Sequence, residues 1–227
     1  MIVLYTATRN YYPYLQWTIT SLLEHNKVSM LYVFAEDDTI PIEITCDNRI
    51  INVSDQKYFL PTSPNINTPY SAMSLMRVCA PEIIQEDKLL YLDVDTIICD
   101  DLLPLWETDI VGKWVAWCPE RCGHWKPYGP GYCNAGILLM NLDQMRKDKV
   151  TDLIVNALNT KFYQFNEQDA MNELFPKDMT VQIDTRYNES FCCGYTDNPA
   201  IVHYAGNWNW YDSRSIYRWE YRAKYDK

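Results

Sequence analysis

Two carboxylates stand two residues apart, directly after an apolar run in the chain. The run from Lys88 to Leu92 has the length and flanking residues of a buried strand, and Asp93 and Asp95 follow it. Because side chains two apart along a strand share a face, we expect both carboxylates to converge at the strand's C-terminal end, where open α/β sheets bind ligands. A divalent cation removes the repulsion between two such charges. The pair predicts an Mg²⁺ or Mn²⁺ site that shares its remaining positions with phosphate oxygens; the simpler alternative is two solvated acids that cap a strand.

A third ligand for that cation is expected far along the chain. The apolar residues before His203 predict a strand over 200–204, and His203 lies near its end much as Asp95 lies after the acidic strand. A lone histidine is more often packed or hydrogen-bonded within a protein core. Since the aspartate pair alone leaves the metal short of ligands, we interpret His203 as the candidate third one.

Other residues suit an anionic or sugar ligand. Arg77 lies within a predicted helix, 70–84, and is either an ordinary salt-bridged arginine or a cation for a phosphate or sugar hydroxyl. Gly136, beside Asn134, either lets the backbone approach a bound group closely or serves packing. The loop 123–131 contains three glycines and two prolines, and a loop of this length can cover a ligand.

Strands and helices alternate along the chain that must position these residues. The predicted strands are 2–6, 30–35, 49–53, 88–92, 114–117, 133–141, 181–184 and 200–204. Helical spacing is found around 15–23 and over 70–84 and 142–158, and a further helix begins at Asn166, its expected N-cap. This alternation predicts the α/β class, with a mostly parallel sheet flanked by helices.

Length and composition limit the class of protein. A chain of 227 residues forms one large domain, or a domain with a small lobe. Its 20 basic and 30 acidic residues give a net charge of −10, which argues against duplex nucleic acid as a partner. Neither a signal peptide nor a run of about 20 apolar residues is present in the sequence, so we expect a cytoplasmic protein with no transmembrane segment.

The eight cysteines are expected to be reduced in that compartment. Cys118, Cys122 and His124 have part of a zinc-ligand spacing, but no second pair completes it, so we interpret these residues as scattered thiols and a lone imidazole. The two N-x-Ser sequons, at Asn52 and Asn188, carry no meaning in a cytosolic chain.

The C-terminal segment 206–225 is dense in tryptophan and tyrosine. We expect these rings to pack into the core rather than to stack on sugars or bases. Arg214, Arg218 and Arg222 are spaced by four residues and would share one face of a helix. That face is either solvated or meets an anionic acceptor or a lipid surface, so peripheral membrane contact stays open.

Five separated stretches, taken together, resemble glycosyltransferase family 8. They are 6–11, Arg77 ahead of 87–95, 133–142, Glu167-Gln168 before Asn172, and 203–206. The resemblance implies a GT-A fold, Rossmann-like with a mixed, mostly parallel sheet, in one domain over 1–227. Residues 1–100 would form the nucleotide-binding half, and residues 101–227 the half that binds the acceptor and completes the metal site.

The activity that the resemblance implies is that of a retaining, metal-dependent hexosyltransferase similar to glycogenin and the family's galactosyltransferases. It would move glucose or galactose from a UDP-sugar to a hydroxyl of a saccharide, glycolipid or protein. Two alternatives stay open: a non-catalytic relative that binds a nucleotide-sugar, and a transferase acting on modified nucleobases. The acidic net charge counts against the second alternative.

The resemblance also assigns roles to residues. Asp93, Asp95 and His203 would hold Mn²⁺ or Mg²⁺, and Gln168, Glu167 and Arg77 would surround the transferred sugar as the catalytic residues. Gln168 is a poor nucleophile, so we expect front-side attack, with Gln168 stabilising the positive charge on the sugar. Tyr11 would stack on the base. The full set expected at the donor is Ala7, Thr8, Asn10, Tyr11, Arg77, Asp93, Val94, Asn134, Ala135, Gly136 and Gly206.

Two positions depart from the family pattern. Asn209 stands where the family places a lysine on the diphosphate, which removes one cation from the leaving group. Arg9 and Arg214 are the candidates to replace that lysine. Thr8 stands where the first loop often has an acidic residue, a difference that bears on selectivity for uracil.

Overall fold

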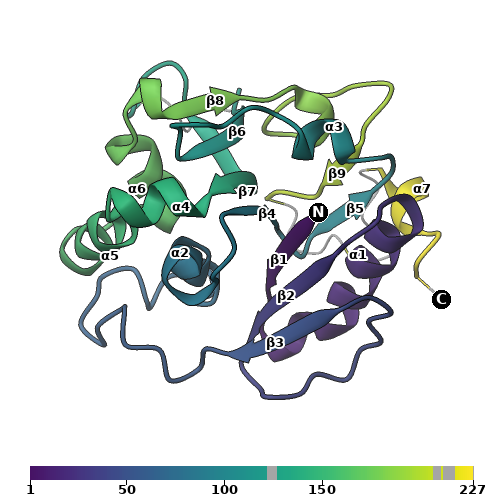
Figure 1. Ribbon diagram of the computed structural model, residues 1–227, viewed down its shortest axis with the longest axis horizontal. Helices are drawn as coiled ribbons and strands as arrows, with labels where there is room; N and C mark the ends of the chain where they lie inside the picture. The colour runs from purple at the N-terminus through teal and green to yellow at the C-terminus, as the bar shows by residue number, and fades with distance from the viewer. Residues whose placement is uncertain (122–126, 207–210, 212–217, 227) are drawn as a thin grey trace.

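The computed structural model describes residues 1–121, 127–206, 211 and 218–226. Its main sheet has seven strands among these residues, in the order β3-β2-β1-β4-β7-β6-β8 (Figure 1). The strands are β1 (Ile2–Thr6), β2 (Met30–Ala35), β3 (Asn48–Asn52), β4 (Lys88–Leu92), β6 (Val115–Pro119), β7 (Cys133–Asn141) and β8 (Thr180–Gln182).

Two kinds of pairing make this sheet mixed, as the sequence predicts. β1 pairs in parallel with β2 and with β4, and β2 pairs in parallel with β3. β7 runs antiparallel to both β4 and β6, whereas β6 and β8 are parallel. β2 and β3 lie on one side of β1 and β4 lies on the other, and the carboxyl ends of β1 and β4 meet the beginning of β7. Such a switch point is where α/β sheets bind ligands.

Alternating side chains of the central strands enter two separate cores. Leu4 and Tyr91 face one core, and Val3 and Leu90 face the other, as the period of two along a strand requires. The first core lies under α5 (Val150–Thr160) and α6 (Asn166–Leu174). The second lies under α1 (Tyr12–His25) on the opposite side of the sheet (Figure 1).

A second sheet of two strands extends from the acidic turn. β5 (Thr96–Ile98) pairs antiparallel with β9 (Ile201–His203), so that Thr96 lies opposite His203. The short helix α7 (Trp219–Arg222) lies beside this sheet (Figure 1). The pairing brings the residue after Asp95 next to a residue more than a hundred positions away in sequence. The pairing therefore brings the two predicted aspartate ligands and the predicted histidine ligand to the same place.

The helix predicted over 142–158 is interrupted. α4 (Leu142–Lys147) ends before Lys149, whose φ of 54° is left-handed, and α5 begins at Val150. Both halves keep their apolar face on the core, and the reversal at Lys149 lets them do so at different angles. The spacing of apolar residues carries no information on this single backbone angle, so the prediction of one continuous helix was wrong.

The segment 70–84 also differs from a regular helix. Residues 72–73 form a turn, Ser74–Cys79 is a 3₁₀ helix, and only α2 (Ala80–Ile83) is α-helical. Asn166 lies in the first turn of α6 with φ of 46°, and the preceding residue Phe165 occupies the N-cap position. The prediction of Asn166 as N-cap was therefore wrong by one residue.

The C-terminal segment is described only in part, and Arg214 lies outside the described residues. Tyr221 and Tyr225 pack against Val202 and Tyr204, and Tyr211 stacks on Tyr14 with ring centroids 4.3 Å apart, so the expectation of packing is confirmed for these rings. Arg222 is buried, which contradicts the predicted solvated face shared with Arg218.

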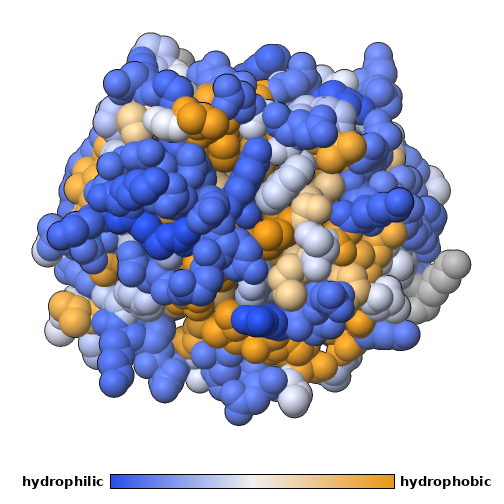
Figure 2. Space-filling model, in the orientation of Figure 1, coloured by the Kyte–Doolittle hydropathy of each residue, from blue (hydrophilic) through white to orange (hydrophobic). Residues whose placement is uncertain are grey.

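The outer face of the molecule in Figure 2 is mostly hydrophilic over α4, α5 and α6, with apolar residues showing towards β3. Among the described residues, no helix combines the length and the apolar character needed to cross a bilayer. A further short α-helix, α3 (Leu103–Trp106), follows β5.

Candidate active site

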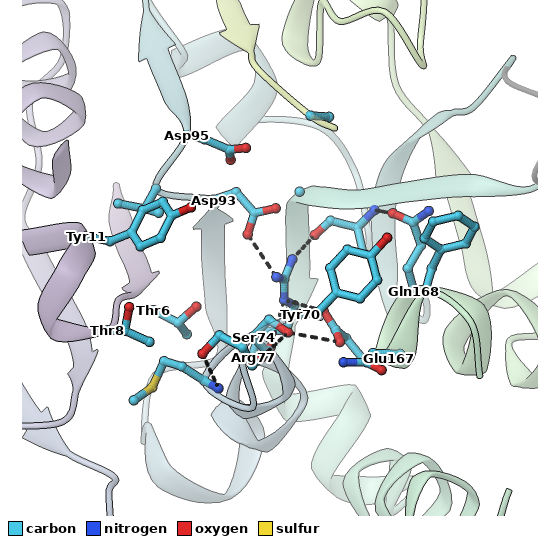
Figure 3. A pocket seen from close by; sticks show the side chains of 18 of the residues that line it. Thr6, Thr8, Tyr11, Tyr70, Ser74, Arg77, Asp93, Asp95, Glu167 and Gln168 are labelled. Carbon is cyan, nitrogen blue, oxygen red and sulfur yellow. Dashed lines mark hydrogen bonds and ion pairs between the residues drawn. The ribbon is translucent and has the colours of Figure 1, made fainter. Parts of the chain in front are cut away.

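A cavity of about 770 Å³ opens where β1 and β4 end and β7 begins. All of the site residues that the sequence predicts line it: Ala7, Thr8, Asn10, Tyr11, Arg77, Asp93, Val94, Asp95, Asn134, Ala135, Gly136, Glu167, Gln168, His203 and Gly206. The structure thus brings together residues from both predicted halves of the chain. Figure 3 shows the part of the cavity around Arg77 and Gln168.

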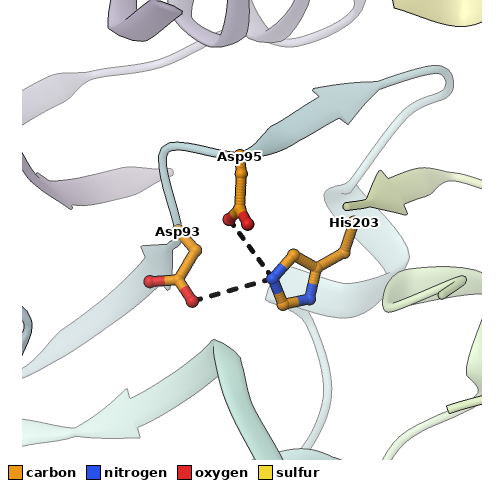
Figure 4. Close-up of side chains that lie close together, drawn as sticks. All are labelled: Asp93, Asp95 and His203. Carbon is orange, nitrogen blue, oxygen red and sulfur yellow. Dashed lines mark ion pairs between the residues drawn. The ribbon is translucent and has the colours of Figure 1, made fainter. Parts of the chain in front are cut away.

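Asp93, Asp95 and His203 form a cluster in which one ligand atom from each lies within 4.8 Å of the others (Figure 4). The Nε2 atom of His203 lies 3.3 Å from Oδ1 of Asp95 and 3.7 Å from Oδ2 of Asp93. Two carboxylates and an imidazole nitrogen suit Mn²⁺ or a related divalent ion. These residues therefore fit the metal that the sequence predicts.

The route by which the carboxylates converge differs from the prediction. β4 ends at Leu92, and Val94 and Asp95 lie in a turn that leads to β5. Strand alternation is therefore not what aligns the two side chains. The turn is fixed by backbone hydrogen bonds from the amide of Asp93 to the carbonyl of Gly136 and from Tyr204 to the carbonyl of Asp95.

The charges in this cluster shift each other's pKa values. Burial lowers the pKa of His203, but the carboxylates of Asp95 and Asp93 outweigh burial and raise it above its ordinary value. Burial raises the pKa of Asp95, but His203 outweighs it and lowers that pKa. The two shifts are consistent with an imidazolium and a carboxylate that stabilise each other when no metal is bound.

Gly136 leaves the space that this cluster needs. A Cβ atom at this position would lie 2.2 Å from Cε1 of His203 and 2.9 Å from Oδ2 of Asp93. Both distances are shorter than a van der Waals contact permits. These distances fit the interpretation of Gly136 as a packing glycine, because protein side chains occupy the space beside it, and close approach to a bound group stays a prediction.

His203 is oriented by a residue that sequence reasoning missed. Its Nδ1 atom lies 2.7 Å from Oδ1 of Asn188, and Nδ2 of Asn188 donates to Oδ1 of Asn134 at 3.0 Å. The backbone amide of Gly136 donates to the same Oδ1 at 2.9 Å. In sequence Asn188 stands out only as part of a sequon, which gives no indication of its place beside His203.

Arg77 connects the candidate metal cluster to Glu167. Its guanidinium lies 2.9 Å from Oδ1 of Asp93 and 3.1 Å from Oε1 of Glu167, and it donates to the carbonyl of Ala135 at 2.6 Å. It also lies over the ring of Tyr91, 4.4 Å from the centroid. Of the two interpretations from sequence, the salt-bridged one is confirmed, although the cation also lines the cavity.

Glu167 and Gln168 lie in the first turn of α6 and contact different partners. Burial raises the pKa of Glu167, with Arg77 opposing that shift in part. Gln168 accepts a hydrogen bond from the amide of Ala135 at 2.9 Å and donates to Glu120 and to the hydroxyl of Tyr132, each also at 2.9 Å. The side-chain amide of Gln168 is therefore held in one orientation.

Glu120 and Tyr132 were also missed from the sequence, although they flank the loop predicted to cover a ligand. Part of that loop lies outside the described residues, as do Cys122 and His124 of the zinc interpretation. Tyr132 donates to Asp169 at 2.6 Å, and Glu120 lines the cavity. A buried carboxylate in contact with Gln168 is a signal that only the folded chain reveals.

The first loop forms the other end of the cavity. Tyr11 packs edge-on against Tyr14, with ring centroids 5.9 Å apart. Burial raises the pKa of the Tyr11 hydroxyl. Arg9, one candidate for the missing lysine, forms an ion pair with Asp37 at 2.7 Å. Asn209 and Arg214 lie outside the described residues. Arg9 is therefore engaged by a carboxylate at the rim of the cavity.

The family model for glycosyl transferase family 8 matches residues 2–211. The chain belongs to this family. It is 28% identical to General stress protein A of Bacillus subtilis over 64% of this chain and 62% of that protein. It is 26% identical to the glycosyltransferase GlyF of Streptococcus pneumoniae over 97% of this chain and 61% of that protein.

Solved structures show the same fold as this family 8 member. The galactosyltransferase LgtC, in complex with donor and acceptor sugar analogs, matches with a TM-score of 0.72 at 22% identity, over 91% of this chain and 87% of that one. The apo form of GlyE from Streptococcus pneumoniae matches with a TM-score of 0.72 at 21% identity, over 97% of this chain and 59% of that one. The fold is GT-A.

The chain spans between 48% and 62% of the length of four curated relatives, General stress protein A, GlyF, GlyB and GlyE. The chain has the family 8 sequence pattern over residues 2–211 and a candidate metal site at Asp93, Asp95 and His203.

Proposed function

We propose that this chain transfers a hexose, glucose or galactose, from a UDP-sugar to an acceptor hydroxyl with retention, in a reaction that depends on Mn²⁺ or Mg²⁺. One observation carries the proposal: Asp93, Asp95 and His203 converge in the same cavity as Arg77 and Gln168. A metal site and an oriented amide in one cavity suit cleavage of a bond between a sugar and a diphosphate.

Asp93, Asp95 and His203 would hold the metal ion. When bound, such an ion supplies Lewis-acid stabilisation of the negative charge that develops on the departing diphosphate. The protein also holds the carboxylate of Asp93 in place. Arg77 and the hydroxyl of Tyr91 contact its Oδ1, and its Oδ2 faces His203. The carboxylate is therefore fixed before any ligand enters.

Gln168 would lie beside the anomeric carbon of the transferred sugar. A carboxamide is a poor nucleophile, so retention by way of a covalent intermediate on Gln168 is disfavoured. We propose front-side attack, in which the acceptor hydroxyl passes its proton to the departing phosphate oxygen. The oriented dipole of Gln168 would stabilise the positive charge on the sugar, and Arg77, paired with Glu167, would position Asp93.

Both halves of the chain would contribute to the donor site. Residues 7–11 would hold the uridine, with Tyr11 stacked on the base, and Val94, Asn134, Ala135 and Gly206 would surround the diphosphate and sugar. The second half would bind the acceptor, which is a saccharide, a glycolipid or a protein.

Release of free UDP from UDP-glucose and UDP-galactose, with and without Mn²⁺, tests the proposal. We expect metal-dependent release from at least one donor, reduced by 100-fold or more, about 2.7 kcal/mol or more, in Asp95→Asn. The matched control is Asp152→Asn, which changes an exposed aspartate on α5 and should leave the rate unchanged. Retention is checked by the anomeric configuration of the product.

The opposing result is equally clear. If UDP binds in the presence of Mn²⁺ but both donors stay intact with every hydroxyl acceptor tried, the chain is a nucleotide-sugar-binding relative. Rates that are equal in Asp95→Asn and in the parent protein would remove the metal site from the proposal.

A further inference from the structure

His203 can bind a metal through Nε2 only when the proton of its neutral ring is on Nδ1. The two tautomers of imidazole have similar energies, so the surroundings must select one. The carboxylates of Asp95 and Asp93 lie next to Nε2 and favour a proton there, which is the wrong tautomer for metal binding. The site therefore requires a group on the opposite side of the ring that holds a proton on Nδ1.

A chain of hydrogen bonds supplies that group, and its direction is set at one end by the backbone. The amide of Gly136 can only donate, so the atom of Asn134 that it contacts at 2.9 Å is the carbonyl oxygen Oδ1. Asn188 approaches the same oxygen at 3.0 Å, so it must present its NH₂ group there. The other end of the Asn188 amide is then its oxygen.

That oxygen is 2.7 Å from Nδ1 of His203 and can only accept, so the proton is on Nδ1 and the lone pair of the neutral ring is on Nε2. Asn188 and His203 are both almost completely buried, so water does not compete for these bonds. The backbone holds the two residues in register, because the amide of His203 donates to the carbonyl of Glu189, the residue after Asn188.

We infer that Asn188 is a positioning residue for the metal site. The amide of Gly136 fixes the orientation of the Asn134 side chain, and Asn134 in turn fixes that of Asn188. The oxygen of Asn188 then keeps the proton of the neutral His203 ring on Nδ1. The inference rests on the metal site proposed above. Residues that orient a ligating histidine in this way change metal affinity by about 10-fold to 100-fold when they are replaced. Asn188 contacts His203 on the side of the ring opposite to Nε2 and would therefore act on the metal through His203.

The first measurement is the tautomer. Nitrogen-15 NMR of the metal-free protein, at a pH where the ring of His203 is neutral, separates the two tautomers, and His203→Gln assigns the signal among the three histidines. We expect Nδ1–H in the parent protein. In Asn188→Leu we expect a shift towards Nε2–H, because only the carboxylates then compete for the proton. In Asn188→Asp we expect Nδ1–H to persist, because a carboxylate still accepts from Nδ1.

The second measurement is the Kd for Mn²⁺ alone, by calorimetry. We expect it to rise at least about 10-fold in Asn188→Leu and less in Asn188→Asp. Asn141→Leu is the matched control, since Asn141 caps α4 at the far end of β7 and should lower stability with little change in this Kd.

A ring that carries its proton on Nε2 in the parent protein would overturn the inference, as would a folded Asn188→Leu with unchanged tautomer and Kd. If Asn188→Leu does not fold, the tautomer of His203 in the parent protein and in Asn188→Asp tests the inference. A proton on Nε2 in Asn188→Asp would also count against it. Neither measurement uses turnover. A protein that passes both tests but transfers no sugar would refute the proposed function and leave the role of Asn188 intact.

Discussion

At the scale of single residues, Gly136 has the least freedom at the site. A methyl group there would overlap His203 and the metal-facing oxygen of Asp93, at 2.2 and 2.9 Å. We predict that Gly136→Ala raises the Kd for Mn²⁺ at least about 10-fold, because one ligand or the strand must move. Calorimetric titration with Mn²⁺ measures this change.

The control for this prediction is Gly112→Ala. Gly112 has a φ of 66° and open space around its Cβ position, so alanine there should cost roughly 1 kcal/mol of stability without affecting the metal. If Gly136→Ala binds Mn²⁺ as the parent protein does, the ligands have more freedom than these distances allow.

Arg77 is the residue whose loss should disturb the folded state most directly. Arg77 is buried and forms ion pairs with the carboxylates of Asp93 and Glu167. Arg77→Met therefore leaves these two carboxylates without their shared cation. We predict a loss of about 3–5 kcal/mol in the free energy of unfolding. Urea denaturation measures it, with Lys147→Met, which breaks an exposed pair on α4, expected to cost less than about 1 kcal/mol. Similar losses in the two variants would contradict the prediction.

The raised pKa of His203 predicts how metal binding depends on pH. Since a proton must leave Nε2 before a metal binds there, the Kd for Mn²⁺ should rise by up to about tenfold per pH unit as pH falls below that pKa, which is above the ordinary 6.5. In the metal-free protein the same shift stabilises the fold fully below 6.5, and this stabilisation is lost as pH rises through the folded-state pKa.

Titrations with Mn²⁺ at a series of pH values check this prediction. His25→Gln replaces an exposed histidine at the end of α1 and should leave the pH profile unchanged. A Kd that is constant down to pH about 6 would show that Nε2 of His203 does not bind the metal.

At the scale of elements, the sequence predicts strands better than it predicts the segments between them. Continuous apolar runs locate β1, β4 and β7, because each of these strands is buried on both faces. The turn after Leu92 has no such signal, yet it is the turn that directs Asp93 and Asp95 towards His203. Likewise, the left-handed angle at Lys149 depends on how two helices pack, which a pattern of apolar residues does not record.

The loop before Arg77 depends on one buried amide. Asn65 accepts from the amide of Tyr163 and donates to the carbonyls of Leu158 and Lys161, at 2.9, 2.6 and 2.7 Å. These bonds attach the proline-rich loop to the end of α5, and residues 68–71 farther along the loop line the cavity.

We predict that Asn65→Ala costs about 2–4 kcal/mol in the free energy of unfolding, because it leaves buried backbone groups unpaired, and that it raises the KM for the donor. Denaturation and steady-state kinetics measure the two effects. Asn67→Ala, at an exposed position of the same loop, is the control and should change neither. An unchanged KM in Asn65→Ala would separate the loop from donor binding.

At the scale of the whole molecule, the site depends on contacts between parts that are distant in sequence. Family resemblance located the residues of the cavity because each lies in a recognisable local stretch. Glu120, Tyr132 and Asn188 were missed because their roles arise only from the side chains that they meet in the folded chain. Sequence patterns therefore predict which residues face the ligand more readily than which residues hold them in place.

The C-terminal segment is connected through Glu189 to His203 of the candidate metal site. Arg218 contacts Oε1 of the buried Glu189 through two nitrogens, at 2.9 and 3.1 Å, and donates to the carbonyl of Thr196 at 2.8 Å. Glu189 in turn accepts the amide hydrogen bond of His203. The ion pair between Arg218 and Glu189 thus couples the C-terminal segment to His203 of the candidate metal site.

We predict that Arg218→Met lowers the free energy of unfolding by about 3–5 kcal/mol, because it removes this cation from a buried carboxylate, and that it weakens Mn²⁺ binding through the displaced β9. The exposed pair between Lys224 and Glu24 also joins the tail to α1, but Lys224→Met should cost less than about 1 kcal/mol. Thermal denaturation and Mn²⁺ titration of both variants decide the matter. Equal losses of stability and Mn²⁺ affinity in the two variants would contradict a specific role for Arg218. A loss confined to Arg218→Met would mean that the ion pair with Glu189 holds His203 in place.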